Sequence, residues 1–250
     1  MYYSEKSLSL RLEIIKILNI MKNISKVVAA LILSIALLCA AGCKKHNSGN
    51  GSYNGHDYVD LGLPSGTLWA TCNVGADIPE GYGDHFAWGE TTQKTAYYWS
   101  TYKYCNEGID QLTKYCTDSN LGYNGFTDNL TTLRPKDDAA TANWGSGWLS
   151  PTIEQWRELE NNTTGTWTTQ NGVNGRLFTA SNGNSIFLPA AGIRMVSEIS
   201  SDGSRGFYWS SSLIKSTPYY AYDVFFDSIG TETRSYCRYM GQCVRAVRKN

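Results

Sequence analysis

The sequence predicts an α+β fold with one or two short helices, a mostly antiparallel sheet and long ordered loops. From Tyr58 onward the chain is rich in Gly, Asn, Thr, Trp and Tyr and poor in long helical patterns, which favours short strands. Asn182-Gly183 stands between two apolar runs and is a strong hairpin signal. Thr152 and Gln155 have the spacing of a capping box, which marks the start of one helix.

The first half of the domain carries two strand signals and a long loop. Residues 58–61 predict a first strand, and residues 63–66 contain the Pro and Gly of a turn. Residues 67–72 alternate in hydropathy, which predicts a second strand with one apolar face. Residues 76–130 are full of Gly, Asn, Asp and Tyr and are expected to form loops.

Two short helices are predicted before the C-terminal strands. Residues 137–144 begin with Asp137 and Asp138, whose charges suit the positive N-terminus of a helix. Residues 153–160 follow the capping box, and their apolar side chains share one face. The strands predicted after them are 176–179, 185–188, 206–211, 219–226, 232–237 and 243–248.

The N-terminal region has the layout of a secretory signal peptide. Two lysines precede an unbroken apolar run at residues 27–38, and small residues then lead into Cys43. A cysteine in this place resembles the lipobox of bacterial lipoproteins, in which it is lipidated and becomes the first residue of the mature chain. The alternative is a transmembrane anchor, but the run is shorter than the roughly 20 apolar residues that span a bilayer.

These features divide the chain into three parts. Residues 1–43 are the signal region with its lipobox, and translation is expected to start at Met21. Residues 44–54 are polar and rich in Gly, Ser and Asn, which predicts a flexible tether. Residues 55–250 are expected to form one domain, which is long enough to bury a sizeable core.

The charge balance argues against nucleic acid as a partner. The whole chain has 22 basic and 22 acidic residues, and the signal region holds more basic than acidic ones. The mature part is therefore slightly acidic, whereas nucleic acid is bound by a strong basic field. We expect a solvated domain that meets the membrane through its lipid anchor.

Several short motifs occur in the order found in one known family. They are DLGLPSG at 60–66, WATCNVGA at 69–76, WLSPT at 148–152 followed by EQW and Leu159, LPAAG at 188–192, YWSSS at 208–212 and VRAVR at 244–248. Together, over residues 55–249, they resemble the Fibrobacter succinogenes major paralogous domain, which is common in lipoproteins of gut Bacteroidota. That family is similar to C-type-lectin-like folds and to formylglycine-generating sulfatase-modifying enzymes. The resemblance therefore implies a C-type-lectin-like fold.

The domain has five cysteines, and export would allow disulfides between them. We expect Cys105–Cys116 to close the long loop and Cys237–Cys243 to join the last two strands, with Cys72 as a small buried residue. The alternative follows from the resemblance: the formylglycine-generating enzymes use two nearby cysteines and copper to oxidise a substrate cysteine. Cys237 and Cys243 would be that redox pair, although the residues around them do not match that active site.

Aromatic side chains gather in the loop-rich segment. Tyr97, Tyr98, Trp99, Tyr102 and Tyr104 are the candidate ligand contacts, because aromatic-rich loops on a rigid scaffold suit protein or glycan recognition. The alternative is that they pack this segment onto the domain. The chain has three histidines and lacks the His and Cys spacings of zinc sites, so no metal and no cofactor are expected.

The function predicted from these observations is a lipoprotein of the cell envelope that carries a non-catalytic, C-type-lectin-like binding or adhesion module for protein or glycan. Its expected location is the outer membrane, on either the periplasmic or the extracellular face. One alternative is a sulfatase-modifying-type cysteine oxidase that uses Cys237 and Cys243. Another is a structural envelope protein without a dedicated ligand.

Overall fold

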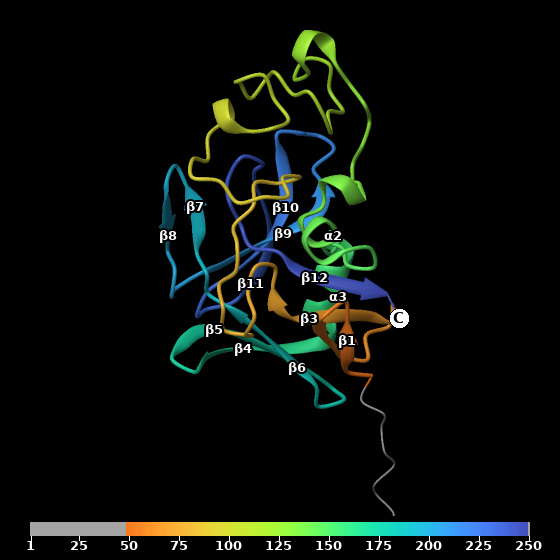
Figure 1. Ribbon diagram of the computed structural model, residues 1–250, viewed down its shortest axis with the longest axis vertical. Coiled ribbons are helices and arrows are strands. Elements are labelled where there is room, and N and C mark those ends of the chain that lie inside the picture. Colours follow the sequence, from red (N-terminus) through yellow and green to blue (C-terminus); the bar gives the residue numbers. More distant parts are fainter. Residues whose placement is uncertain (1–48, 250) are drawn as a thin grey trace, which may run out of the picture. The chain divides into compact units, whose positions relative to one another are not determined.

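The computed structural model describes residues 49–249, which are drawn in colour in Figure 1. Cys43, the signal region and residues 44–48 of the expected tether lie outside the described residues. Within residues 49–249, no helix has both the length and the apolar character needed to cross a bilayer.

The fold consists mostly of antiparallel sheets with few helices, which agrees with the α+β prediction. The strand orders are β1-β2-β3-β12, β11-β10-β9, β4-β5-β6 and β7-β8. The strands are β1 Gly51–Tyr53, β2 His56–Asp60, β3 Thr67–Asn73, β4 Thr163–Gln170, β5 Val173–Ala180, β6 Ser185–Pro189, β7 Ile193–Met195, β8 Glu198–Ser200, β9 Gly206–Leu213, β10 Tyr220–Phe226, β11 Thr231–Cys237 and β12 Arg245–Lys249.

Both predicted helices form. Helix α3 (Ile153–Asn162) begins with the predicted capping box, in which the Thr152 hydroxyl accepts from the Gln155 backbone and the Gln155 side chain accepts from the Thr152 backbone. Helix α2 (Ala139–Trp144) is capped by Asp138, which accepts hydrogen bonds from the backbone of residues 140 and 141. Three 3₁₀ turns add Trp99–Thr101, Tyr123–Gly125 and Pro135–Asp137.

Four strands, β1, β4, β7 and β8, are missing from the sequence prediction. β1 lies inside the segment expected as a tether, and it pairs with β2 across a two-residue turn at Asn54-Gly55, both of which have positive φ. Ordered structure therefore begins before residue 55. β4 follows α3 directly and pairs along its whole length with β5, although its Thr-rich sequence has no clear apolar alternation.

Two large clusters of buried side chains form the core. One contains Trp69, Trp156 and Tyr208 and packs α3 against β3 and the sheets around it. The other contains Trp88, Trp148 and Trp209 and lies beneath the insert, which we define as residues 76–135. In Figure 1 the yellow and green part of the insert lies at one end of the described part, and β4, β5 and β6 lie at the other. The long loops are thus ordered by a core that they share with β3, α2, β9 and β12.

Candidate functional site

The structure buries three of the five aromatic residues predicted as ligand contacts. Tyr97, Tyr102 and Tyr104 are buried, so the prediction that they contact a ligand is wrong. Their ring bodies pack in the core beneath the insert, and their hydroxyls are hydrogen-bonded. Tyr98 is 43% exposed and Trp99 is half-buried, so these two remain candidates for contact.

Arg238 fastens the insert to the C-terminal strands. Its guanidinium is fully buried and donates to the Tyr102 hydroxyl at 2.9 Å and to the backbone carbonyls of residues 114, 115 and 218. It also lies over the Trp88 ring, 5.0 Å from the centroid. Carbonyl dipoles and aromatic faces therefore stabilise this cation. The insert is held in one position by these contacts.

Asp137 makes a second polar anchor under the insert. Its carboxylate accepts from the hydroxyls of Tyr104 at 2.6 Å and Tyr115 at 2.7 Å, and it forms an ion pair with Lys114. These hydrogen bonds, opposed by burial, hold the pKa of Asp137 below its usual value. The carboxylate stays charged at neutral pH and keeps both tyrosines in place.

An aromatic surface stands on this rigid base. We use that name for Tyr98, Trp99, Tyr219, Tyr220 and Tyr239, which are half-buried or exposed. The backbone N–H of Arg238, next to Tyr239, donates to the carbonyl of Tyr219 at 3.2 Å and brings these two segments together. The Trp99 and Tyr239 rings lie 5.0 Å apart, and the Tyr219 and Tyr220 rings 4.6 Å apart. Sequence reasoning missed Tyr219, Tyr220 and Tyr239, because they are more than 100 positions from Trp99 and no local pattern connects them.

The expected disulfides are not formed. All five cysteines of the described part are free. The Cys105 thiol donates to the carbonyl of Trp99 at 2.9 Å, and the Cys116 thiol donates to that of Asp118 at 3.1 Å. Each thiol thus has a backbone partner close to it in sequence.

The geometry also separates Cys237 from Cys243. Cys237 ends the edge strand β11, whereas Cys243 pairs with Tyr208 on the side of β9 away from β10. Three strand spacings, about 14 Å, therefore lie between them, and a disulfide requires Cα atoms within about 7 Å. The expected redox pair is not present in this arrangement.

Cys243 has a histidine neighbour but lacks the features of an activated nucleophile. Its sulfur lies 3.7 Å from His85 Nε2, and that nitrogen is 3.1 Å from the carbonyl of Ala191. The thiol lies 3.3 Å from the carbonyl of Tyr82, to which it donates. Burial raises the pKa of Cys243 to about 12 and lowers that of His85. Both groups are therefore neutral at pH 7, and no thiolate forms.

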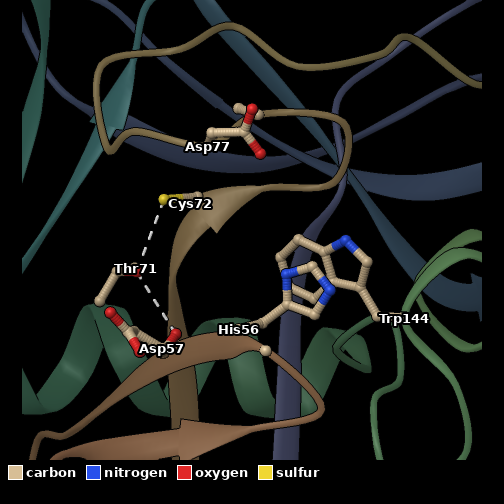
Figure 2. Close-up of a pocket in the computed structure, with 8 residues that line it drawn as sticks. His56, Asp57, Thr71, Cys72, Asp77 and Trp144 are labelled. Carbon is tan, nitrogen blue, oxygen red and sulfur yellow. Dashed lines mark hydrogen bonds between the residues drawn. The ribbon is translucent and has the colours of Figure 1, made fainter.

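A separate pocket of about 130 Å³ lies between the β1–β2 hairpin, β3 and the end of α2. Its lining residues are Gly55, His56, Asp57, Thr71, Cys72, Ala76, Asp77 and Trp144. Figure 2 shows His56 and Trp144 on one side of it and Cys72 and Asp57 on the other, with Asp77 on the loop above. Cys72, expected as a buried residue, is half-buried and borders this pocket.

The wall of the pocket is a stack of aromatic rings. The His56 ring lies parallel to the Trp144 indole at 3.9 Å, and Trp148 meets Trp144 edge-on at 5.2 Å. The hairpin is fixed to this wall, because Asn54 donates to the carbonyl of Trp144 and the Trp148 indole donates to that of Tyr53. The pocket therefore has a preorganised side.

The loop above the pocket is set by the turn after β3. Gly75 has φ of 86°, and a Cβ there would lie 2.8 Å from the backbone nitrogen of Asp84. Only glycine fits this position, and the backbone of Ala76 donates back to the carbonyl of Asn73 at 3.0 Å. The turn places Asp77 at the mouth of the pocket.

The pocket is acidic. Asp57 and Asp77 are exposed, no Lys or Arg lines the pocket, and neither carboxylate is in an ion pair with a described residue. Burial lowers the pKa of His56, and the charges of Asp77 and Asp57 oppose that shift. In residues 49–249, no group of three His, Cys, Asp or Glu side chains is arranged to hold a metal ion.

Comparison with known proteins found no match: no family model, no curated protein and no solved structure matches this chain.

Proposed function

We propose that the protein is a lipoprotein of the cell envelope, anchored through Cys43, whose domain is a non-catalytic, C-type-lectin-like binding module. The aromatic surface is the observation that carries the binding role. Its side chains come from the insert and from the C-terminal strands, and Arg238 joins these two parts. A surface that is ordered before binding loses less entropy when a ligand arrives, which favours affinity.

The composition of this surface favours a glycan as the ligand. Tyrosine and tryptophan rings can stack on the apolar faces of sugar rings while their polar atoms meet the hydroxyls. Four of its five members are tyrosines, each with a hydroxyl beside an apolar ring. A protein ligand is the alternative, since the same residue types are common in antibody-like contact surfaces.

The oxidase alternative requires Cys237 and Cys243 to act together. Their separation by two intervening strands and the neutral, buried thiol of Cys243 oppose that chemistry. A structural role without a ligand predicts that changes of exposed aromatic residues leave every binding measurement unaltered.

A glycan array probed with the full-length protein tests the proposal. Trp99→Ala and Tyr239→Ala should each weaken binding of the best glycan at least about tenfold, as expected for loss of a central aromatic contact. Tyr123→Ala is the matched control, because Tyr123 is 42% exposed on a different part of the insert. If the glycan still binds both variants, or if Tyr123→Ala weakens its binding equally, the aromatic surface is not the binding site. An array without any bound glycan contradicts the glycan and favours a protein ligand.

A further inference from the structure

The outer edge of the β11-β10-β9 sheet carries backbone groups without partners. Strand β11 lies at this edge, and β10 is its one neighbour among the described strands. The Asp227 N–H donates to the Gly230 carbonyl across the turn, which fixes the β11 residues that face β10. By the alternation of an antiparallel ladder, the N–H and C=O groups of Thr231, Thr233 and Ser235 point away from β10. No described residue bonds them, and Ser235 is exposed, so the edge is open to another strand.

Other sheet edges are at least partly closed by bonds of this kind. Leu149 exchanges two backbone hydrogen bonds with Val247 of β12, and the Arg176 side chain donates to the carbonyl of Gly165 in β4 at 2.9 Å. Proteins usually shield their edge strands in such ways, because an open edge pairs with other chains. Strand β11 has seven residues, no proline and no such shield. Its edge therefore has the character of an interaction surface that accepts a strand.

The charges of β11 match a second copy of the same strand. Glu232 and Arg234 lie on one face of β11, and neither is in an ion pair with a described residue. When two β11 strands pair antiparallel about a twofold axis at Thr233, Glu232 of each copy lies directly opposite Arg234 of the other. Opposite charges in these cross-strand positions stabilise the pairing. The same register places the outward groups of Thr231 opposite those of Ser235, which gives about six backbone hydrogen bonds between the copies.

The same charges disfavour the neighbouring registers. Outward backbone groups must face outward groups, so the next symmetric registers have their centres at Glu232 or at Arg234. A centre at Glu232 sets the two copies of this carboxylate against each other, and a centre at Arg234 does the same with the two guanidinium groups. Like charges directly opposite are destabilising. The sequence of β11 therefore selects the register centred on Thr233.

The ends of the paired stretch offer apolar contacts. A hollow of about 390 Å³ lies at the start of β11, and it is lined by Phe225, Asp227, Ile229, Gly230, Thr231 and Glu232. The Ile229 side chain is 91% exposed, and a Cβ at Gly230 would meet no atom within 4 Å. In the register centred on Thr233, Tyr236 of the second copy lies opposite Gly230. Its ring covers this open glycine next to Ile229, which removes apolar surface from water at both ends.

We propose that the protein forms a symmetric dimer through its β11 edges, with one continuous sheet across both copies. The occupant of the open edge is thus a second copy of this chain. The dimer needs no glycan and no lipid anchor, so it can form whether or not the aromatic surface binds a ligand.

Sedimentation velocity of the full-length protein in detergent tests the proposal. We expect a monomer–dimer equilibrium with a dissociation constant of about 100 µM, so that dimers are evident at about 0.3 mM. Glu232→Lys sets like charges opposite each other in both pairs, and it should weaken dimerisation at least about tenfold. Glu198→Lys makes the same charge change at an exposed acid of β8, and this matched control should leave dimerisation unchanged.

Two further variants make the test specific. Arg234→Glu should also be monomeric by itself, whereas its mixture with Glu232→Lys should form dimers, because opposite charges then meet in both pairs. Thr233→Pro removes an outward N–H that bonds no described residue, so it should abolish the dimer and keep the fold. This variant also leaves Arg234 on the Phe225 ring, and circular dichroism checks its fold. A protein that is monomeric at about 0.3 mM, a dimer that both Glu232→Lys and Thr233→Pro leave intact, or equal weakening by Glu198→Lys would overturn the proposal.

Discussion

Asp223 offers a direct test of the core under the C-terminal strands. It lies in β10, fully buried, and neither carboxylate oxygen has a hydrogen-bond partner among the described residues. The side-chain amide of Gln242 is also fully buried, and neither its nitrogen nor its oxygen has a hydrogen-bond partner among the described residues. Arg234 is opposite Asp223 in the β10–β11 register, but its guanidinium lies over the Phe225 ring at 3.6 Å. Burial raises the pKa of Asp223 to about 7, and Arg234 opposes part of that shift.

The direction of the pH effect follows from this raised pKa. Below about pH 4, both the folded and the unfolded chain hold the proton, and Asp223 does not affect the pH dependence. Between about pH 4 and pH 7 the unfolded chain loses the proton while the folded chain keeps it, so the free energy of unfolding falls as pH rises. A shift of about three pKa units at about 1.4 kcal/mol each gives a total loss of about 4 kcal/mol by pH 8.

Asp223→Asn removes the ionisable proton and keeps the shape of the side chain. We expect the variant to be more stable than the unmodified protein at pH 8, by up to about 4 kcal/mol, and nearly equal to it at pH 4. Urea unfolding followed by tryptophan fluorescence at several pH values measures both free energies, and the difference cancels all other titrating groups. A difference that does not grow between pH 4 and pH 8, or a variant less stable at pH 8, would refute the reasoning.

Three further predictions concern other parts of the chain. Arg238→Met should lower the free energy of unfolding by about 3 kcal/mol or more, because it removes the donors to three carbonyls and a tyrosine hydroxyl. Chemical denaturation measures this free energy, and Arg205→Met, at an exposed arginine, is the control. A thiol reagent should label half-buried Cys72 in the folded protein faster than Cys243, which is fully buried with a pKa of about 12, and mass spectrometry follows both. If Cys243 reacts only after reduction, it is in a disulfide and the free-thiol arrangement is wrong. Cys43→Ser should abolish incorporation of labelled fatty acid, and unchanged incorporation would contradict the lipobox interpretation.

The elements that the sequence predicted are those with local signals. The capping box of α3 needs only residues 152 and 155, and the β5–β6 hairpin needs only the Asn-Gly turn between two apolar runs. The acidic cap of α2 is likewise local, since Asp138 bonds the backbone two and three positions ahead. Such signals act through short-range hydrogen bonds and backbone preferences, so they can be recognised without the rest of the fold.

The β1–β2 hairpin shows how the same signal can be missed. Asn54-Gly55 is an Asn-Gly turn like Asn182-Gly183, but the residues before it are polar and resemble a linker. The strand is stabilised from outside, because Tyr53 packs near Trp148 and donates to the carbonyl of Ser146. Tertiary contacts of this kind leave no pattern in the strand itself.

The pocket and the cysteine arrangement depend on contacts between distant parts of the chain. His56 and Trp144 are far apart in sequence and meet in a parallel stack, which neither residue type indicates by itself. Cys237 and Cys243 are close in sequence, yet the strand order places β10 and β9 between them. Sequence proximity suggested the disulfide, and sheet topology excludes the contact.

Two buried arginines explain how a chain with so many loops can present a fixed surface. Arg245 donates to the carbonyls of residues 70, 71 and 187 and to Asn73, and so joins β3 to β6. Arg238 joins the insert to the C-terminal strands in the same way. A guanidinium group can bond several carbonyls at once, so one side chain orders backbone that lacks a sheet or helix partner. These anchors lie beneath the loops. The substitutions Trp99→Ala and Tyr239→Ala therefore remove a ring from the aromatic surface and leave both arginines in place. Loss of binding in those variants with an unchanged unfolding midpoint would therefore report on recognition, and a lowered midpoint would place the two rings among the supports of the insert.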